Sequence, residues 1–291
     1  MMKTLYSIII TCSYIILLSG CDIVEPPYTV SSTGEPVNPG PGALRKVLLE
    51  DFTGHQCGNC PSAAYLAQEL KDLYGDQLII YAAHVGSYAF PDITPYLYDF
   101  RCVTGNEIAD QFGITSGAGI PLPVGMVNRK EINGNPVLDR GDWGTTLASI
   151  LDNPAEVSMD VSSSYNSSTR QLAVTVNTEF LQAMDGTYNL CVFMTEDSIV
   201  KWQKIYPAFP VPGYPTGDVE DYVHRHVLRG SMNNTWGDEI AAGSVAAGDT
   251  VFSSFTATLD TGWVENKMSV VAYVYDFTTK EIIQAEEEHL H

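Results

Sequence analysis

The hydrophobic periodicity of this chain changes once, at Asn153 and Pro154. Before that point, short apolar runs alternate with stretches whose apolar residues recur every three or four positions, as in buried strands and amphipathic helices. After it, apolar and polar residues alternate with period two, which is typical of strands with one buried face. This change predicts an α/β domain over residues 43–153, followed by an all-β domain over residues 154–291.

The first predicted domain contains a β-α-β unit. Its strands are expected at 46–52 and 78–83, with a helix at 61–74 between them. Further elements are expected as a helix near 106–112, a strand at 124–128 and a final helix at 142–151. Together they predict a mixed sheet with helices on its faces.

The second predicted domain is all-β. Alternating segments begin at Val157, Leu172, Leu190 and Met268. We expect an immunoglobulin-like sandwich of about seven strands, without the paired cysteines typical of that fold. The stretch 206–217, rich in Pro and Gly, is predicted to be a long loop.

The composition indicates a folded chain and excludes one class of partner. Of the 291 residues, 45% are hydrophobic and 17% are charged, which supplies enough apolar material for a core. The formal net charge of −20 would repel the phosphates of nucleic acids, so nucleic-acid binding is not expected.

The first twenty residues have the features of a secretion signal. A basic residue precedes an apolar stretch that is too short and interrupted for a membrane span, and the segment ends Leu18-Ser19-Gly20-Cys21. This ending resembles the processing motif of bacterial lipoproteins, which implies lipidation of Cys21 and a lipid anchor in the cell envelope, at the outer membrane. An ordinary cleaved signal would give the same destination. Residues 21–42 are expected to form a flexible Pro- and Gly-rich tether.

Two of the six cysteines form the motif Cys57-Gly58-Asn59-Cys60, between the first predicted strand and helix. In a β-α-β context this spacing indicates redox chemistry. The N–H groups and dipole of the helix N-terminus would stabilise the Cys57 thiolate and make it nucleophilic. Cys60 would then resolve the mixed disulfide that Cys57 forms with a substrate.

This segment resembles the thioredoxin superfamily, and the resemblance implies two further catalytic residues. Asp51, six positions before Cys57, matches the buried acid that manages the proton of the resolving cysteine. Glu50 is its neighbouring competitor. Pro123, followed by an apolar strand, matches the cis-proline that packs beside the cysteine pair.

Three details qualify the thioredoxin resemblance. Leu122–Pro123 is the expected cis bond, with Ile120–Pro121 as the weaker candidate. Gln56 stands where the family has tryptophan, and Gly-Asn replaces Gly-Pro between the cysteines.

A wider resemblance covers the chain from Arg45 to its C-terminus. The stretches 53–61 (TGHQCGNCP) and 222–230 (YVHRHVLRG) look like the 28-kDa outer-membrane-protein-related family. Members of that family are Bacteroidetes-type lipoproteins with a thioredoxin-like domain. The resemblance implies an envelope lipoprotein.

Other interpretations of the thiols stay open. The CxxC pair would also suit a static structural disulfide in an oxidising compartment, or a zinc site completed by His55 and His84. Cys102 and Cys191 are expected to be small buried hydrophobes, although a bridge between them would link the two domains.

Two groups of polar residues have weak metal-binding patterns. His224 and His226 would point to one face of a strand, a spacing that suits a metal but more often reflects packing. Asp218, Glu220 and Asp221 are expected in a solvated loop, with weak calcium binding as the alternative.

Two functions follow from these patterns. The first is an envelope thiol-disulfide oxidoreductase, with Cys57, Cys60, Asp51 and Pro123 in the catalytic roles above and a sandwich that recognises a protein thiol or disulfide substrate. The second is a noncatalytic surface lipoprotein that binds an extracellular protein or glycan, with the CxxC as a structural disulfide. Neither a cofactor nor a metal is expected.

Overall fold

The computed structural model describes residues 44–114 and 119–290. All of these belong to one compact unit, Pro39–His291. The predicted signal segment 1–20, the lipidation site Cys21 and the tether 21–42 lie outside the described residues. Within the described part of the chain, no helix has both the length and the apolar character needed to span a membrane.

The N-terminal half forms the elements that its periodicity predicts. They are β1 (Val47–Thr53), α2 (Cys60–Tyr74), β2 (Leu78–His84), α3 (Val103–Gln111), β3 (Val124–Val127) and α4 (Trp143–Leu151). β1 pairs in parallel with β2 and antiparallel with β3. Every residue of these three strands is buried, which explains their continuous apolar runs.

The C-terminal half is all strand, as predicted, but it has ten described strands where about seven were expected. They are β4 (Val157–Asn166), β5 (Gln171–Phe180), β6 (Met184–Glu196), β7 (Ile199–Ile205), β8 (Gly217–His224), β9 (Val227–Ser231), β10 (Asp238–Val245), β11 (Thr250–Thr258), β12 (Met268–Asp276) and β13 (Ile282–His289). The additional strands include β8 and β10, whose exposed faces are polar or small and therefore weaken the alternating pattern.

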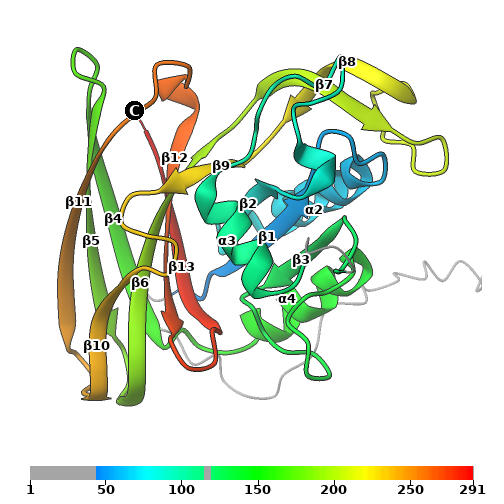
Figure 1. The fold of residues 1–291 in the computed structure, drawn as a ribbon. Coiled ribbons are helices and arrows are strands. Elements are labelled where there is room, and N and C mark those ends of the chain that lie inside the picture. Colours follow the sequence, from blue (N-terminus) through cyan, green and yellow to red (C-terminus); the bar gives the residue numbers. More distant parts are fainter. Residues whose placement is uncertain (1–43, 115–118, 291) are drawn as a thin grey trace, which may run out of the picture. The chain divides into compact units, whose positions relative to one another are not determined.

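The fold class predicted from the sequence, a thioredoxin-like α/β domain followed by an immunoglobulin-like sandwich, is wrong. Strands from both halves join in one mixed sheet of eight strands, ordered β13-β12-β6-β9-β2-β1-β3, with β10 paired to β6. β9 makes the connection, because Ala82 of β2 pairs with Val227 and its N–H donates to the His226 carbonyl at 2.7 Å. Figure 1 shows β9 between β6 and β2. The edge of β2 is thus occupied by the other half of the chain.

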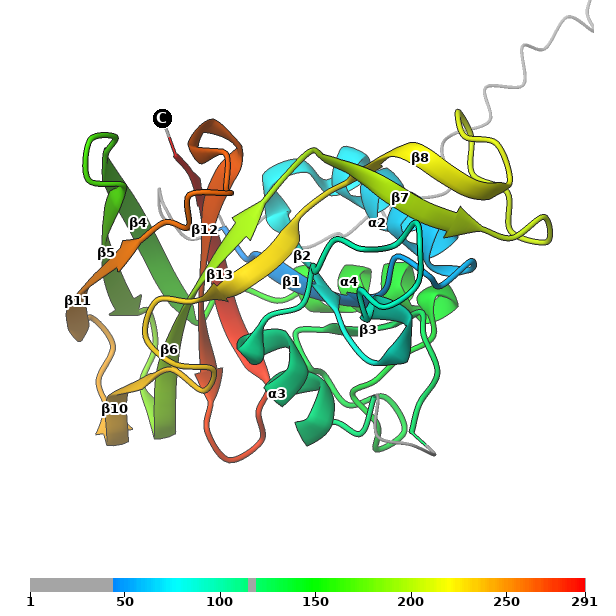
Figure 2. The ribbon, with the colours of Figure 1, turned by 45° about the horizontal axis from the view of Figure 1, so that its top comes forward.

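Three hydrophobic cores cover this sheet. One core lies on a face shared by both halves and takes residues from β1, β2, α3, β6, β9, β12 and β13. A second core packs α2 and α4 against β1 and β2. A third packs the three-stranded sheet β11-β5-β4 against β6 and β12. Figure 2 shows the separate β7–β8 hairpin crossing in front of α2.

A buried ion pair lies within the shared core. Arg129, which follows β3, donates from Nε and Nη2 to the two carboxylate oxygens of Glu50, at 2.8 Å each. The same Nη2 donates to the Tyr273 hydroxyl of β12 at 3.0 Å, and the Tyr81 hydroxyl of β2 donates to Glu50. Both charged side chains are fully buried. The pair therefore joins β1, β2, the end of β3 and β12 through directional bonds.

We expect Arg129→Met to destabilise the protein by about 3–5 kcal/mol, because it leaves the Glu50 carboxylate buried without its cation. Urea denaturation of residues 22–291 measures the change. The double variant Glu50→Leu/Arg129→Met should recover most of the loss, since it removes both charges. A loss below about 1 kcal/mol in the single variant would contradict this role of the pair.

Candidate functional site

Cys57 and Cys60 form a disulfide in the turn between β1 and α2. α2 begins at Cys60, with Asn59 as its N-cap residue, so Cys57 lies before the helix rather than at its first residue. Only 4% of Cys57 and 1% of Cys60 is exposed to solvent. Both positions that were predicted to exchange thiols with a substrate are therefore inside the protein.

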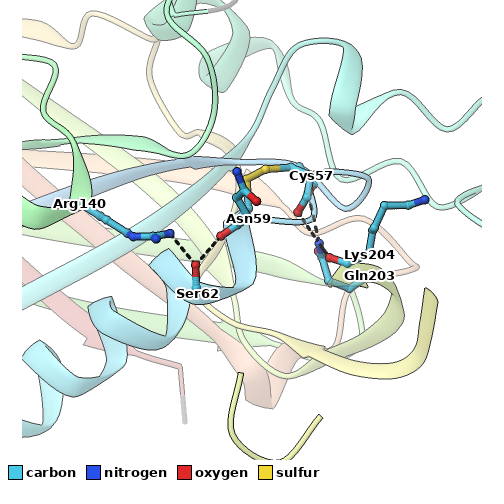
Figure 3. The surroundings of a disulfide bond; sticks show 8 residues. Cys57, Asn59, Ser62, Arg140, Gln203 and Lys204 are labelled. Atoms are coloured by element: carbon cyan, nitrogen blue, oxygen red, sulfur yellow. Dashed lines mark hydrogen bonds between the residues drawn. A yellow bond between two sulfur atoms is a disulfide. The ribbon is translucent and has the colours of Figure 1, made fainter. Parts of the chain in front are cut away.

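The β7–β8 hairpin and the loop at its tip cover this disulfide. The side-chain amide of Gln203, in β7, donates to the Cys57 carbonyl at 3.1 Å (Figure 3). Just after β7, the N–H of Tyr206 donates to the Gly58 carbonyl at 2.9 Å. A Cβ atom at Gly58 would come within 2.3–2.6 Å of the Tyr206 ring, so only glycine permits this close approach. The cover is fixed to the backbone of the motif.

The other side of the turn is held from the segment that precedes α4. The Ser62 hydroxyl donates to the Asn59 carbonyl at 2.7 Å, and Arg140 donates to the Ser62 hydroxyl at 2.5 Å (Figure 3). The guanidinium of Arg140 also lies 5.2 Å from the ring centre of Phe209, in the loop after β7. The CxxC turn is thus fixed from two directions.

Asp51 and Glu50 are both buried, but their environments are opposite. Because successive side chains of a strand point to opposite faces, Glu50 lies in the shared core beside Arg129, and Asp51 lies on the α2 side of β1. Asp51 is 2% exposed, and its Oδ1 has no hydrogen-bond partner. Burial alone raises the pKa of Asp51 to about 7. Asp51, and not its competitor, is the unpaired acid near the disulfide.

Asp51 borders two neighbouring pockets beneath the β7–β8 hairpin. A small cavity of about 30 Å³ extends toward Cys60, His84 and His224. A larger pocket of about 170 Å³ opens outward between α2 and β8. The structure therefore brings Asp51 and Cys60 to one cavity, but both cysteines stay buried, and the catalytic role of Asp51 stays a prediction.

The histidines near this site have structural contacts. His84 and His224 are buried, and their rings each lie 4.4 Å from the ring of Phe100. Burial lowers the pKa of His84 well below its usual range and that of His224 to about 3. His55 stacks on Tyr96, with ring centres 5.4 Å apart. Across residues 44–114 and 119–290, no group of three or more His, Cys, Asp or Glu side chains is placed to hold a metal.

The predicted shared face of His224 and His226 is absent. β8 ends at His224, and His226 adopts a left-handed backbone with φ of 53°. The chain turns there to begin β9, so the two residues do not occupy one face of a single strand.

The acidic Asp218 has partners within the protein. Its carboxylate accepts a hydrogen bond from the Tyr96 hydroxyl at 2.5 Å and lies 3.4 Å from the Lys204 ammonium.

The remaining predicted site residues are placed as follows. The Leu122–Pro123 bond is cis, and Pro123 directly precedes β3, which pairs with β1. Cys102 and Cys191 are free thiols. Cys102 accepts a hydrogen bond from the Gly105 N–H at the start of α3, and Cys191 is buried in the shared core, so they form no bridge. The catalytic role of Pro123 stays a prediction.

The cover over the disulfide is a feature that the sequence did not predict. The strand β7 begins at Ile199 and ends at Ile205, and the polar side chain of Gln203 within it is buried. A polar residue at an inward position hides the alternating pattern that would otherwise identify a strand. The apolar residues Ile199 and Ile205, at the two ends of β7, were the sequence signal from which this strand could have been identified.

We expect Asp51→Asn to stabilise the protein, in a way that depends on pH. The folded pKa of Asp51, about 7, lies above its value of 3.8 in an unstructured chain, so the folded state binds more protons between these pH values. The free energy of unfolding therefore falls as pH rises from about 4 to about 7, and the asparagine variant lacks this fall. Its advantage should be near zero at pH 4 and at most about 4 kcal/mol at pH 8, measured by urea denaturation. Equal stability of the two proteins at pH 8 would show that Asp51 is not held in an unfavourable environment.

Comparison with solved structures gives matches of low sequence identity, of which three are described. A domain of the outer membrane lipoprotein Omp28 from Porphyromonas gingivalis is 20% identical, with a TM-score of 0.32, over 47% of this chain and 89% of that chain. A structural-genomics protein from Agrobacterium tumefaciens is 13% identical, with a TM-score of 0.45, over 84% of this chain and 93% of that chain. The sporulation control protein Spo0M from Bacillus subtilis is 16% identical, with a TM-score of 0.26, over 47% of this chain and 49% of that chain. No curated protein matches the sequence.

The family comparison is more extensive. Residues 107–290 match the model of the family described as outer membrane protein Omp28. This match spans more than half of the chain and agrees with the family resemblance found in the sequence, although the thioredoxin-like part of that resemblance is not confirmed. The predicted association with the outer membrane is confirmed by this family, and the lipid anchor at Cys21 stays a prediction. The chain belongs to the Omp28 family of outer membrane proteins.

Proposed function

We propose that this chain is a noncatalytic lipoprotein that binds a protein partner at the cell envelope, and that its CxxC motif is a structural disulfide. One observation carries the proposal: both sulfurs are buried beneath the β7–β8 hairpin. Thiol–disulfide exchange requires a thiolate to reach a sulfur atom, and its rate depends on that access. The buried pair favours the noncatalytic function over the oxidoreductase.

A structural disulfide suits this position in the fold. The bridge closes a short loop between β1 and α2. A loop of this length lowers the entropy of the unfolded chain and so stabilises the folded state by about 2 kcal/mol. The turn that it closes also provides the Cys57 and Gly58 carbonyls, to which the β7–β8 hairpin is bonded. Reduction would therefore loosen the attachment of the hairpin.

The anchor in this proposal is a lipid on Cys21, the residue that the lipoprotein motif designates. The tether of residues 21–42 would separate the folded unit from the membrane. A protein held in this way can meet partners at the envelope without any membrane-spanning element.

The partner surface in this proposal is the segment 86–102, which follows β2. It presents four large apolar side chains to solvent, and Leu97, the most exposed of them, is 61% accessible; they are Tyr88, Phe90, Ile93 and Leu97. The Arg101 guanidinium lies 4.5 Å from the ring centre of Phe90. Exposed apolar groups with aromatic residues and arginine are typical of protein interfaces. This composition favours a protein over a glycan.

A recess lies next to this surface. It has a volume of about 310 Å³ and is lined by His55, Pro95, Tyr96, Leu97, Tyr98, Phe100, Lys201 and Trp202. An apolar pocket at the centre of an interface can receive an anchoring side chain of the partner. The recess therefore gives the segment both an exposed apolar surface and a place for an anchor.

We expect the disulfide of residues 22–291 to resist dithiothreitol under native conditions and to become reducible in urea, because only unfolding or opening of the hairpin exposes the sulfurs. Tyr206→Ala removes the ring that lies against Gly58 and should speed native reduction about tenfold, whereas Phe252→Ala, on the distant edge strand β11, should not. Mass spectrometry of alkylated samples measures the reduced fraction.

The same proteins decide between the two functions in an insulin-reduction assay with dithiothreitol. The parent should be no faster than Cys57→Ser. Rapid native reduction, with an insulin activity that Cys57→Ser abolishes, would reject the noncatalytic function and restore the oxidoreductase.

The partner surface is tested by a photo-cross-linking residue placed at Leu97 in the lipidated protein in its host cells. We expect a covalent product with a protein at Leu97 and none at Phe252, which is equally apolar and exposed but lies outside the segment. Identical products at both positions would reject the segment as the binding surface. If the parent binds to a glycan array and Tyr98→Ala does not, the partner is a glycan and the proposed protein partner is rejected.

A further inference from the structure

The larger pocket beside Asp51 is a second candidate site, separate from the segment 86–102. It lies between one side of α2 and the strand β8, with β1 and β2 as its floor, and its volume is about 170 Å³. The lining side chains come from six parts of the fold: Asp51, Ala64, Tyr65, Ala67, Gln68, Ile80, Ala82, Val211, Pro212, Tyr214, Tyr222, Val223, Arg225 and His226. Asp51 is the acidic group among them.

The acid in this pocket has no partner within the protein. Asp51 is almost fully buried, and its Oδ1 accepts no hydrogen bond. A buried carboxyl group without a partner is costly, and such groups are concentrated at binding and catalytic sites. Arg225 does not neutralise it, because its guanidinium lies 3.2 Å from Asp197, outside the pocket, and is half exposed.

The walls of the pocket are aromatic and apolar. Tyr214 and Tyr222 lie with ring centres 4.8 Å apart, and Tyr65 is on the exposed face of α2. Aromatic rings attract cations through their negative faces, and their bodies pack against alkyl chains. Val211 and Pro212 complete the apolar wall.

We propose that this pocket binds a primary ammonium group on a short alkyl chain, with the ammonium paired to the Asp51 carboxylate and the chain packed against the tyrosine rings. The ammonium belongs either to a free alkylamine or to the lysine side chain of a peptide. A carboxylate ligand would be repelled by Asp51, and an uncharged apolar ligand would leave the acid without a partner. The net charge of −20 also attracts cations to the protein.

The small cavity on the inner side of Asp51 supports this arrangement. Its volume of about 30 Å³ is enough for an ordered water molecule. Both ring nitrogens of His84 and the Nε2 of His224 have no hydrogen-bond partner within the protein. A water molecule there would bond these groups and hold Asp51 oriented toward the larger pocket.

The titratable groups that face Asp51 determine how the binding of an amine depends on pH. The larger pocket contributes the phenols of Tyr65, Tyr214 and Tyr222, with Arg225 and His226 at its edge. Burial raises the pKa of Tyr222 and lowers that of His226.

On the inner side, burial keeps His84 and His224 uncharged, because it lowers the pKa of both. Asp51, with a pKa of about 7, is therefore the group whose charge changes between pH 6 and pH 8. Only its ionised form pairs with an ammonium, so binding should weaken about tenfold from pH 8 to pH 6.

Isothermal titration of residues 22–291 tests the proposal, with n-butylamine and Nα-acetyl-lysine methylamide as probes. We expect saturable binding of at least one probe at pH 8 and about tenfold weaker binding at pH 6. Asp51→Asn should weaken binding at least about tenfold at pH 8, whereas Asp76→Asn, an exposed acid beyond the end of α2, should leave it unchanged. Tyr65→Ala, at an exposed helix position, should weaken it several-fold through loss of the aromatic wall.

The two probes distinguish the sources of the ammonium. Preference for the lysine derivative indicates a peptide ligand, and preference for n-butylamine indicates a free amine. Absence of binding by both probes, or equal binding by the parent and Asp51→Asn, would overturn the proposal. These titrations use the oxidised protein and do not depend on the insulin or cross-linking results, so amine binding and the noncatalytic function can fail separately.

Discussion

The ion pair between Glu50 and Arg129 is the constraint on which the arrangement of the sheet depends. A carboxylate and a guanidinium that are fully buried are costly unless they pair with each other. Tyr81 and Tyr273 add hydrogen bonds to the pair from β2 and β12, strands that are nearly two hundred residues apart in the sequence, although Nη1 of Arg129 has no partner. The N-terminal strands are thereby fixed against the C-terminal strands in one shared core.

This pair also determines the environment of the neighbouring acid. The alternation of β1 directs Glu50 to the shared core and Asp51 to the opposite face, beneath α2. The buried guanidinium of Arg129 is used by Glu50, and Asp51 stays unpaired with a raised pKa. Two adjacent acidic residues thus have different chemistry: one stabilises the fold, and the other is available to a ligand.

The β7–β8 hairpin connects the candidate sites. Its strand β7 and the following residue Tyr206 cover the disulfide, and its strand β8 forms a wall of the pocket at Asp51. The same element therefore withholds the sulfurs from solvent and creates a cavity beside an unpaired acid. This combination is physically suited to binding, because a covered disulfide reacts slowly while an adjacent pocket remains accessible.

The sequence predicted the candidate residues of the site better than their environment. Cys57 and Cys60 were identified from their spacing, and Asp51 from the resemblance to thioredoxins; the structure places Asp51 and Cys60 at one cavity. Their burial was not predictable, because Gln203 of the covering strand is 146 residues from Cys57 in the sequence, and no local pattern encodes such a contact.

The sequence by itself determined the helices and strands of the N-terminal half and the strand character of the C-terminal half. Helix and strand character depends on the spacing of apolar residues over a few helical turns or along one strand, which is a local property of the sequence. The tertiary structure decided which strands are neighbours. The buried apolar sequence of β2 is compatible with any apolar strand at its edge. In the fold, β9 lies at that edge, with Val227 opposite Ala82. Strand pairing depends on backbone hydrogen bonds and on the covering of both sheet faces, and these are set by the whole fold rather than by the residues of one strand.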